Sequence, residues 1–426
     1  MQNLQAFARK ITLILFVEQS LASAGFIAAA TLNSIVSEKL AHHAGWAGVP
    51  TAVYLLAGAL SAFAWGYVMD AIGRRGGLVS GLLFGALGSG LAFYAIALSS
   101  FILFLIGMVF MGIASAAVGL GRFAAAEVNP PEARGRAISN VVIGGTVGSV
   151  IGPFVAGPAG RFFLPFAGDE LAGAYAVSLI LFAVGAFVVF FGLRPDPREL
   201  GRQVAELHPE TETGPDGARR ASNRPPRAVL EIFRQPAALV ALLAMTLGQM
   251  VMVLVMVITS LHMRGHQHGL GAISVVISAH TFGMFAFSIL SGRLADRWGR
   301  GPVIIVGTST LALACVAATF SADVLPLGVA LFLLGLGWNF CFVGGSALLS
   351  DQLSPAERAR TQGFNDLLVG LASAIGSLES GIIFEGLGFN TMAYISAAFA
   401  LIPLAVALFW TLGRAWPPQA LSSSGS

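Results

Sequence analysis

Methionine and histidine side chains are concentrated in one stretch of the chain, between positions 245 and 284. Six of the eleven methionines and four of the seven histidines fall there. Met252 and Met256 are four residues apart, as are His280 and Met284, and this spacing puts the two side chains of each pair on one face of a helix. Thioether sulfur and neutral imidazole select soft metal ions, Cu(I) above all. The four residues therefore predict a soft-metal site.

Packing is the alternative interpretation, because methionine is a flexible side chain that fills gaps between helices. The joint occurrence of the two pairs on neighbouring helices favours the metal. Met252 and His280 each lie nine residues from the loop that joins these helices, so both are expected at a similar depth, with Met256 above and Met284 below.

The joining loop carries four more soft-ligand residues: His262, Met263, His266 and His268. One interpretation is an entrance that collects metal above the predicted site. The other is that these are ordinary solvent-exposed loop residues.

Two carboxylates in apolar surroundings are candidates for a second chemistry. Glu18 lies in LFVEQSLAS and Glu379 in GSLESG. A carboxylate inside a membrane is costly unless it is protonated or paired, which makes each a candidate for proton coupling. A structural hydrogen bond to another helix is the alternative. Arg122, also inside an apolar run, is expected to pair with Glu127.

The composition requires that these side chains be positioned by membrane-spanning helices. The chain of 426 residues is 56% hydrophobic and 11% charged, whereas soluble domains carry about 25% charged residues. The net charge of +3 does not indicate nucleic acid, because the arginines cluster in loops. Cys315 and Cys341 lie in apolar runs and suggest no disulfide. We find no metalloprotease motif, nucleophile motif or cofactor loop, so we expect neither an enzyme nor a bound cofactor.

Windows of about 20 apolar residues, the length of a membrane-spanning helix, occur twelve times. The predicted spans are 11–32, 49–69, 77–98, 101–126, 137–160, 172–193, 237–261, 271–291, 302–320, 325–350, 361–384 and 390–412. With the N-terminus in the cytoplasm, 20 of the 24 Lys and Arg residues fall on the cytoplasmic side. Both termini are therefore predicted to be cytoplasmic, in a bacterial inner membrane.

The two halves of the chain repeat one another. EVNPPEARGR, from Glu127, aligns without gaps on DQLSPAERAR, from Asp351, and GYVMDAIGRR, from Gly66, aligns on GRLADRWGR. Both pairs occupy equivalent loops. We therefore predict an all-α membrane protein of twelve transmembrane helices in two pseudo-symmetric six-helix bundles.

The predicted division of the chain follows from this repeat. The N-terminal bundle spans 1–193, a polar cytoplasmic linker 194–236, the C-terminal bundle 237–412 and a cytoplasmic tail 413–426. Within the linker, a short amphipathic helix is predicted near Val229–Phe233.

At these residues the sequence resembles the major facilitator superfamily over essentially its whole length. The loop motif of that family, G-x-x-x-D-x-x-G-R-[KR], matches Gly66, Asp70, Gly73, Arg74 and Arg75. The resemblance implies alternating access and a conformational latch, in which Asp70 faces the start of span 11 and Arg74 pairs with Glu127. The repeat implies a second latch formed by Asp296, Arg300 and Asp351.

Two substrate classes follow from finer resemblances. The M-x-x-x-M and H-x-x-x-M pattern of spans 7 and 8 resembles the CcoA-type copper importers, which implies Met252, Met256, His280 and Met284 as copper ligands. The stretch GSVIGPFVAG instead resembles drug–proton antiporters, although Met108 stands where that family has an arginine. We expect a monomeric transporter, symporter or antiporter, that imports copper as its substrate, with proton-coupled efflux of a drug or small metabolite as the alternative. A metal sensor that moves nothing is a third interpretation.

Overall fold

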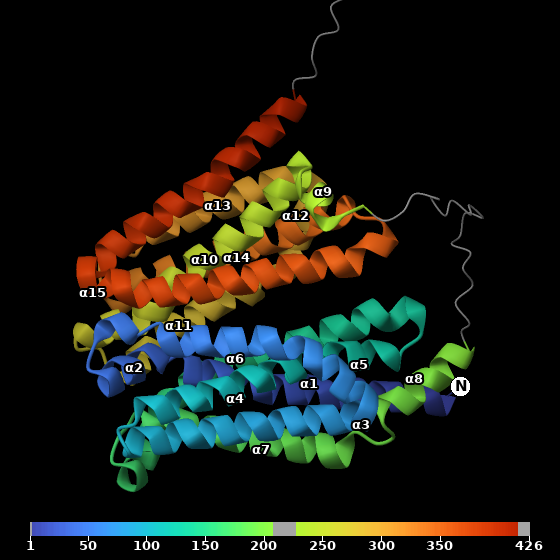
Figure 1. The fold of residues 1–426 in the computed structure, drawn as a ribbon, viewed down its shortest axis with the longest axis horizontal. Helices are drawn as coiled ribbons and strands as arrows, with labels where there is room; N and C mark the ends of the chain where they lie inside the picture. The colour runs from blue at the N-terminus through green and yellow to red at the C-terminus, as the bar shows by residue number, and fades with distance from the viewer. Residues whose placement is uncertain (1, 208–226, 416–426) are drawn as a thin grey trace, which may run out of the picture.

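The computed structural model describes residues 2–207 and 227–415, and all regular elements of these residues are helices (Figure 1). The elements of the first half are α1 (Gln2–Ala30), α2 (Asn33–Ala41), the short 3-10 helix η1 (Ala44–Trp46), α3 (Val49–Ala97), α4 (Phe101–Gly119), α5 (Gly121–Glu127), α6 (Pro131–Ala167) and α7 (Ala172–Gly192). Those that follow are α8 (Pro197–Leu207), α9 (Val229–Phe233), α10 (Pro236–Gly265), α11 (Leu270–Phe285), α12 (Ser288–Trp298), α13 (Arg300–Ala317), α14 (Val324–Asp351) and α15 (Pro355–Ala415).

Twelve membrane crossings result from ten apolar helical segments of the described residues. Two of these segments, Ala44–Ala97 and Arg360–Gly413, are 54 residues long, whereas one crossing needs about 20 residues. Each leaves helical geometry at one glycine, Gly73 in α3 and Gly388 in α15. Both long helices therefore cross twice, and the predicted twelve-helix fold is confirmed.

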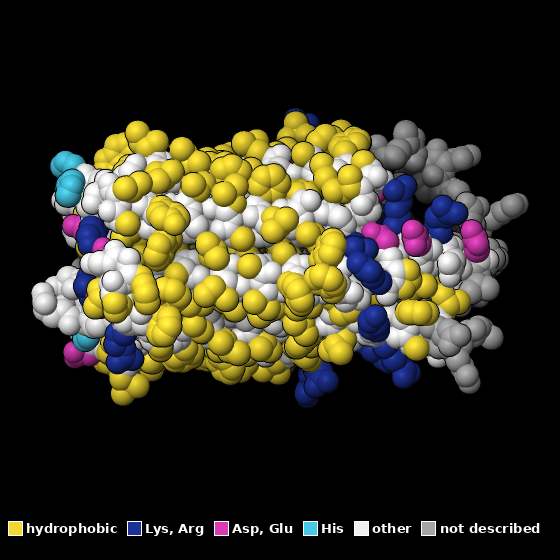
Figure 2. All heavy atoms as spheres, turned by 90° about the horizontal axis from the view of Figure 1, so that it is seen from below, with side chains coloured by type: hydrophobic (Ala, Val, Ile, Leu, Met, Phe, Trp, Pro, Cys, Tyr) yellow, Lys and Arg dark blue, Asp and Glu magenta, His cyan; other side chains and the backbone are white. Residues whose placement is uncertain are grey.

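The helices form two bundles that lie side by side (Figure 1). Helices α1 to α7 make the N-bundle and α10 to α15 the C-bundle. We call the end that carries the N-terminus, α8 and α9 the linker end, and the opposite end the distal end. In Figure 2, more arginine and lysine side chains are seen at the linker end than at the distal end, and the linker end is the one predicted to be cytoplasmic.

Small residues allow the helices of a bundle to approach closely. A Cβ atom added to Gly88 of α3 would lie 2.6 Å from the carbonyl oxygen of Gly107 of α4, and one added to Gly107 would lie 2.7 Å from that of Gly88. Such contacts are how membrane helices gain packing energy, since burial from lipid gives no hydrophobic driving force. The abundance of glycine is thereby explained.

The predicted linker is attached to both bundles through its described ends. Asp196, just before α8, accepts hydrogen bonds from the backbone N–H groups of Arg74 and Arg75. Just before α9, whose bounds match the predicted short helix, Arg227 forms an ion pair of 2.8 Å with Glu357. This arginine and the Ser354 backbone N–H hold the pKa of the Glu357 carboxyl below its usual range. Residues 208–226 of the predicted linker and 416–426 of the predicted tail lie outside the described residues.

Candidate functional site

The predicted ligand pair of α11 packs against α14 in the C-bundle. His280 of α11 has no exposed surface, and its Nδ1 lies 2.9 Å from the carbonyl oxygen of Leu331. Its Nε2 is buried and has no hydrogen-bond partner. One turn further, Met284 is half-buried and lies against Gly335 of α14. A Cβ added to Gly335 would lie 2.9 Å from the backbone nitrogen of Met284. The imidazole and thioether of α11 thus share one face, directed toward α14.

The methionines of α10 are distributed over more than one face. Met252 is 5% exposed within the hydrophobic core, and Met256 is half-buried beside it. Met250 instead packs on α15, where a Cβ added to Gly376 would lie 3.1 Å from its carbonyl oxygen. Met245 accepts a hydrogen bond from Ser346 of α14. Packing therefore accounts for Met245 and Met250, whereas Met252 and Met256 keep both interpretations.

Trp338 of α14 contacts both α10 and α11. Its indole N–H donates to Gln249 of α10 at 2.5 Å, and its ring lies 6.1 Å from that of Phe285 of α11. It also stacks on Phe342, with ring centroids 5.1 Å apart. Gln249 and Phe285 are consequently at one depth. At about 1.5 Å per helical residue, Met252 and His280 lie within a few ångströms of a common depth above this level.

In the part of the chain that the structure describes, no hydrogen bond joins the α10 pair to the α11 pair. The α11 pair lies against α14, with the Trp338 indole on its linker side. In the described part of the chain, no three His, Cys, Asp or Glu side chains are grouped so that they could hold a metal ion. A copper site would therefore rest on His280 with thioether ligands alone.

The four residues of the predicted metal entrance have different surroundings at the distal end, and the entrance itself stays a prediction. Met263 has no exposed surface because it is turned into the core. The ring of His262 stacks on Phe389 of α15, 3.9 Å between centroids, and His266 folds back with Nδ1 2.9 Å from the His262 carbonyl oxygen. Met263 and His262 are thereby engaged in packing, whereas His266 is exposed and His268 is half-buried just after the turn.

Glu18 of α1 is fully buried inside the N-bundle. Neither carboxyl oxygen has a hydrogen-bond partner. The carboxyl faces Gly121, where α4 is interrupted and α5 begins; a Cβ added there would lie 3.3 Å from Glu18 Oε2. An unpaired carboxylate in such surroundings is costly, which favours the protonated form. Glu379, the other predicted carboxylate, is half-buried on α15 at the level of the distal contacts described below.

Arg122 does not pair with Glu127 as expected, because Glu127 binds Arg74. The Arg122 guanidinium lies 4.9 Å from the ring centroid of Phe123. It is also near enough to Asp366 of the C-bundle for their charges to interact. Spacing along the sequence suggested a local pair, whereas the folded chain offers a partner from the other half.

The repeated loops contain matching ion pairs. Arg74 binds Glu127 at 2.7 Å and Asp70 at 2.8 Å, and Arg300 binds Asp351 at 3.0 Å and Asp296 at 3.1 Å. All these contacts lie within one bundle at the linker end. The Asp70 side chain is 69% exposed and pairs with Arg74, so its predicted position at the start of span 11 is not seen here, and the latch as a whole remains a prediction. Gly66 meets no neighbour, and Arg75 lies over the Phe190 ring at 4.8 Å.

Gly73 and its repeat Gly299 require glycine for a conformational reason. Their φ,ψ angles are 83°, 167° and 92°, 161°, a region that only glycine adopts readily. At Gly73 an added Cβ would also lie 2.5 Å from Asp196 Oδ2.

We expect Gly73→Ala to lower the free energy of unfolding by about 1–3 kcal/mol, the cost of such a backbone conformation. Thermal unfolding of the purified protein measures this change. Gly66→Ala, at a helical position with open space, is the matched control. Equal melting temperatures for the two variants would contradict the assigned strain.

A polar gate at the distal end joins the bundles and was not found from the sequence. Glu385 of the C-bundle accepts from the Gly45 N–H at 3.0 Å and lies 3.2 Å from His43 Nδ1. Arg264 of α10 pairs with Glu170 of the N-bundle at 2.9 Å. The only sequence signal was charge at loop edges, which does not reveal partners more than ninety residues away.

Closer to the middle of the membrane, further contacts join the two bundles, and they extend the distal gate. The Ser377 hydroxyl donates to the Gly48 carbonyl oxygen at 2.7 Å, and Ser278 and Thr281 of α11 donate to the α6 carbonyls of Val150 and Ser149. Gly157, from the antiporter-like stretch, would place a Cβ 3.5 Å from Gly271 of α11. These cross-bundle contacts extend from the distal end to about the middle of α6 and α11, so the molecule is closed there, and Figure 1 shows the bundles diverging toward the linker end.

Comparison with known proteins identifies the family. The family model of the Major Facilitator Superfamily matches residues 15–272 and 250–424. The chain is 32% identical to the uncharacterized transporter YdeG of Bacillus subtilis over 95% of this chain and 93% of that one. It is 29% identical to the riboflavin transporter RfnT of Brucella anthropi, covering 94% and 96%. The fold resembles the crystal structure of the nucleoside transporter NupG, with a TM-score of 0.71 and 15% identity over 96% and 100%. This twelve-helix chain is a multi-pass membrane transporter that belongs to the major facilitator superfamily.

Proposed function

We propose that the chain moves a small organic solute with an aromatic ring system across the membrane, coupled to protons, by alternating access. The observation that carries the coupling is Glu18, a fully buried carboxyl whose two oxygens have no partner. Such a group is stable in this conformation only when it is neutral.

The solute class is supported by the side chains where α10, α11 and α14 meet. Trp338, Phe342 and Phe285 bring three aromatic rings together, and Gln249 adds an amide that accepts from the Trp338 indole. Apolar walls with a few fixed polar groups are typical of small-molecule sites. The riboflavin transporter RfnT, similar over nearly the whole chain, carries a ring system that matches this chemistry.

Proton coupling is proposed because an ionised Glu18 carboxylate, buried without a partner, has a high free energy in this conformation. The distal gate is closed in this conformation and Glu18 is sealed against Gly121. Loss of the proton leaves a charge without a partner, so it favours any arrangement that brings water or a cation to the carboxylate. A proton that binds from one side and leaves to the other thereby shifts the balance between the two orientations of the bundles.

The test is transport by the purified protein in proteoliposomes with an imposed pH gradient. Riboflavin is the first probe, and protein-free liposomes set the leak. We expect gradient-dependent riboflavin movement above that leak. If riboflavin and a set of other aromatic solutes all move at the leak rate, the proposed solute class is wrong.

Copper import is a second candidate, favoured by the unpartnered Nε2 of His280. This nitrogen is free to bind a metal while Nδ1 is held by the Leu331 carbonyl oxygen, an arrangement that fixes the ring of metal-binding histidines. Met284 and Met252 would supply thioethers.

If copper is the substrate, His280→Leu and Met252→Leu should each reduce Cu(I) uptake into proteoliposomes to the leak rate, because a site with so few ligands cannot lose one. Uptake of ascorbate-reduced copper measures this loss. Met250→Leu, a methionine on the α15 face of the same helix, is the control and should transport normally. Uptake that is absent from wild type, or unchanged in both ligand variants, would remove copper as a candidate.

A further inference from the structure

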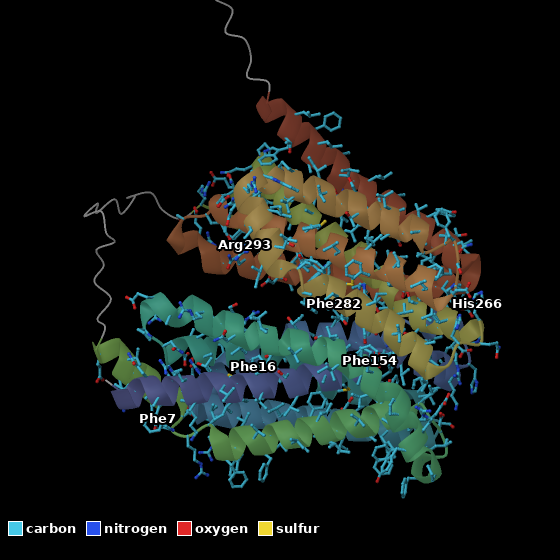
Figure 3. The ribbon with its side chains drawn as sticks, turned by 180° about the vertical axis from the view of Figure 1, so that it is seen from behind. Phe7, Phe16, Phe154, His266, Phe282 and Arg293 are labelled. Atoms are coloured by element: carbon cyan, nitrogen blue, oxygen red, sulfur yellow. The ribbon has the colours of Figure 1, made fainter. Side chains whose placement is uncertain are left out.

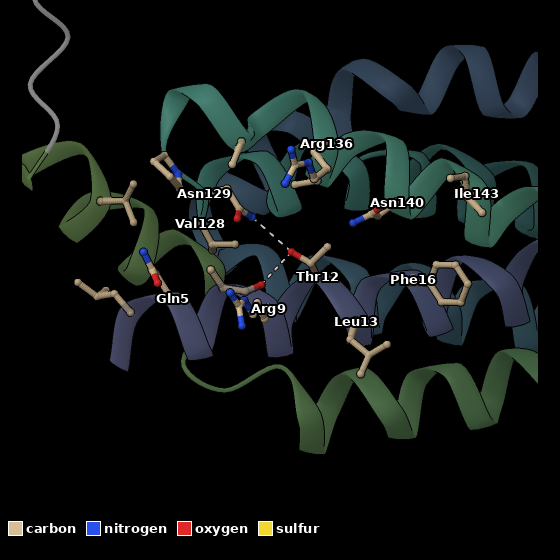
Figure 4. Close-up of a pocket in the computed structure, with 16 residues that line it drawn as sticks. Gln5, Arg9, Thr12, Leu13, Phe16, Val128, Asn129, Arg136, Asn140 and Ile143 are labelled. Atoms are coloured by element: carbon tan, nitrogen blue, oxygen red, sulfur yellow. Dashed lines mark hydrogen bonds between the residues drawn. The ribbon is translucent and has the colours of Figure 1, made fainter. Parts of the chain in front are cut away.

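A cavity at the linker end lies outside the regions described above. It has a volume of about 720 Å³ and is formed by α1 and α6 of the N-bundle, with Val204 of α8 at one side (Figure 4). Arg9 of α1 and Arg136 of α6 both line it. None of its sixteen lining residues is acidic.

The two arginines are not neutralised by the protein. No described residue forms an ion pair with Arg9 or Arg136. Asn140, one turn beyond Arg136, adds an amide that lines the same cavity. The Asn129 amide is already used, since it donates to Thr12 and to the carbonyl oxygen of Ala125. Two guanidinium groups and a free amide in one cavity form a donor set that matches a phosphate.

The cavity becomes apolar toward the middle of the membrane. Leu13 and Phe16 follow Arg9 along α1, and Ile143 follows Arg136 along α6. At about 1.5 Å per residue, each helix changes from cationic to apolar over roughly 10 Å. Leu13 is 63% and Ile143 43% exposed, so the apolar part of the cavity is open rather than covered by protein.

The open side of the cavity belongs to a lateral face of the molecule. Phe16, Phe154 of α6 and Phe282 of α11 are seen on one side in Figure 3, and Phe154 and Phe282 line an apolar groove between the bundles on that side. A lateral face with exposed aromatic and aliphatic side chains contacts acyl chains in a membrane. The arginines lie at the linker end of this face, the predicted cytoplasmic side, where anionic lipids attract basic residues.

We propose that this cavity binds an anionic phospholipid, with its phosphate between Arg9 and Arg136 and its acyl chain along Leu13 and Ile143. The proposal is independent of the transported solute. It commits to a lipid rather than a soluble phosphate because the cationic end is continuous with an exposed apolar wall.

The experiment compares lipids added to the full-length protein in detergent. We expect phosphatidylglycerol to raise the melting temperature more than phosphatidylcholine does, and native mass spectrometry to show bound phosphatidylglycerol. In the double variant Arg9→Gln, Arg136→Gln this difference between the lipids should disappear. Lys10→Gln removes a neighbouring positive charge outside the cavity and should keep the difference.

Several results would overturn the proposal. One is wild-type protein that neither binds phosphatidylglycerol nor distinguishes it from phosphatidylcholine. Another is a double variant that retains the wild-type difference. A third is the same saturable stabilisation by glycerol 3-phosphate, which has the phosphate but no acyl chain and would assign the cavity to a soluble anion. The variant Leu13→Gln, Ile143→Gln, which leaves both arginines in place, should weaken phosphatidylglycerol binding and provides a separate check on the acyl path.

Discussion

Replacing Glu18 with glutamine is expected to reduce gradient-driven transport to the rate of protein-free liposomes. Glutamine has the size of the neutral carboxyl but binds no proton, so the free-energy difference between protonation states disappears from the cycle. The fold should survive, because a neutral group replaces a carboxyl that is already expected to be neutral in its buried position. Transport with and without an imposed pH gradient in proteoliposomes measures the effect.

Exchange transport separates coupling from binding in this variant. If Glu18 couples protons, Glu18→Gln should still exchange labelled for unlabelled riboflavin at equal concentrations, because the bundles can move without a proton. Glu379→Gln is the matched control, since Glu379 is the other carboxylate predicted from the sequence. Normal gradient-driven transport by Glu18→Gln, together with its loss in Glu379→Gln, would show that Glu379 rather than Glu18 couples transport to protons.

The second large effect is expected from Gly48→Ala in the distal gate. A Cβ at position 48 would lie 1.5 Å from the Ser377 carbonyl oxygen and 2.6 Å from its carbon. Backbone atoms of two packed helices cannot yield as a flexible side chain does, so the gate cannot close fully. An overpacking cost of about 1–3 kcal/mol borne by the closed state alone shifts the population about five-fold to 150-fold toward the distal-open state. Transport should fall by a similar factor.

Accessibility of the gate distinguishes this mechanism from general destabilisation. In a Gly48→Ala background, a cysteine at Ser278, which bonds α6 across the bundles, should react faster with a membrane-impermeant thiol reagent. Gly271→Ala is the control, because this distal glycine has open space around its added Cβ. Unchanged labelling with normal transport in Gly48→Ala would show that the distal contacts can separate without cost.

Glu18→Gln and Gly48→Ala change the same transport cycle at two places, the buried carboxyl and the distal gate. Glu18 lies within the N-bundle, whereas Gly48 meets Ser377 between the bundles. A coupled transporter requires that protonation at the first place bias closure at the second. The Glu18→Gln variant should therefore also change the rate of cysteine labelling at Ser278, even though no contact at the gate is altered.

The sequence was sufficient for the twelve crossings and the two halves. Hydrophobic length is imposed by bilayer thickness, and the repeat of EVNPPEARGR on DQLSPAERAR predicted equivalent loops. The pair of Arg74 with Glu127 was named from the family resemblance, and the repeat extended it to Arg300 with Asp351; both ion pairs are present. Gly73 and Gly388, which divide the two longest helices, also fall between predicted spans.

The arrangement of Met252, Met256, His280 and Met284 could be predicted only in part from the sequence. Helical periodicity put His280 and Met284 on one face, and the loop length put Met252 at their depth. It did not reveal that α14 receives both helices, or that the Trp338 indole is inserted between Gln249 and Phe285. Which helices are neighbours depends on packing between spans, and no local spacing encodes it.

What the sequence by itself determined was the set of groups and their depth: a carboxyl at Glu18, an imidazole at His280, and arginines at one end. Helix periodicity and membrane thickness constrain each span separately, so they can be applied to the sequence before the packing of the spans is known. Tertiary structure alone decided which groups meet. It left Glu18 and His280 Nε2 without partners, joined Glu385 to His43, and brought Arg9 and Arg136 to one cavity. These pairings arise from contacts between helices distant in sequence, where close approach of small residues selects one arrangement of bundles.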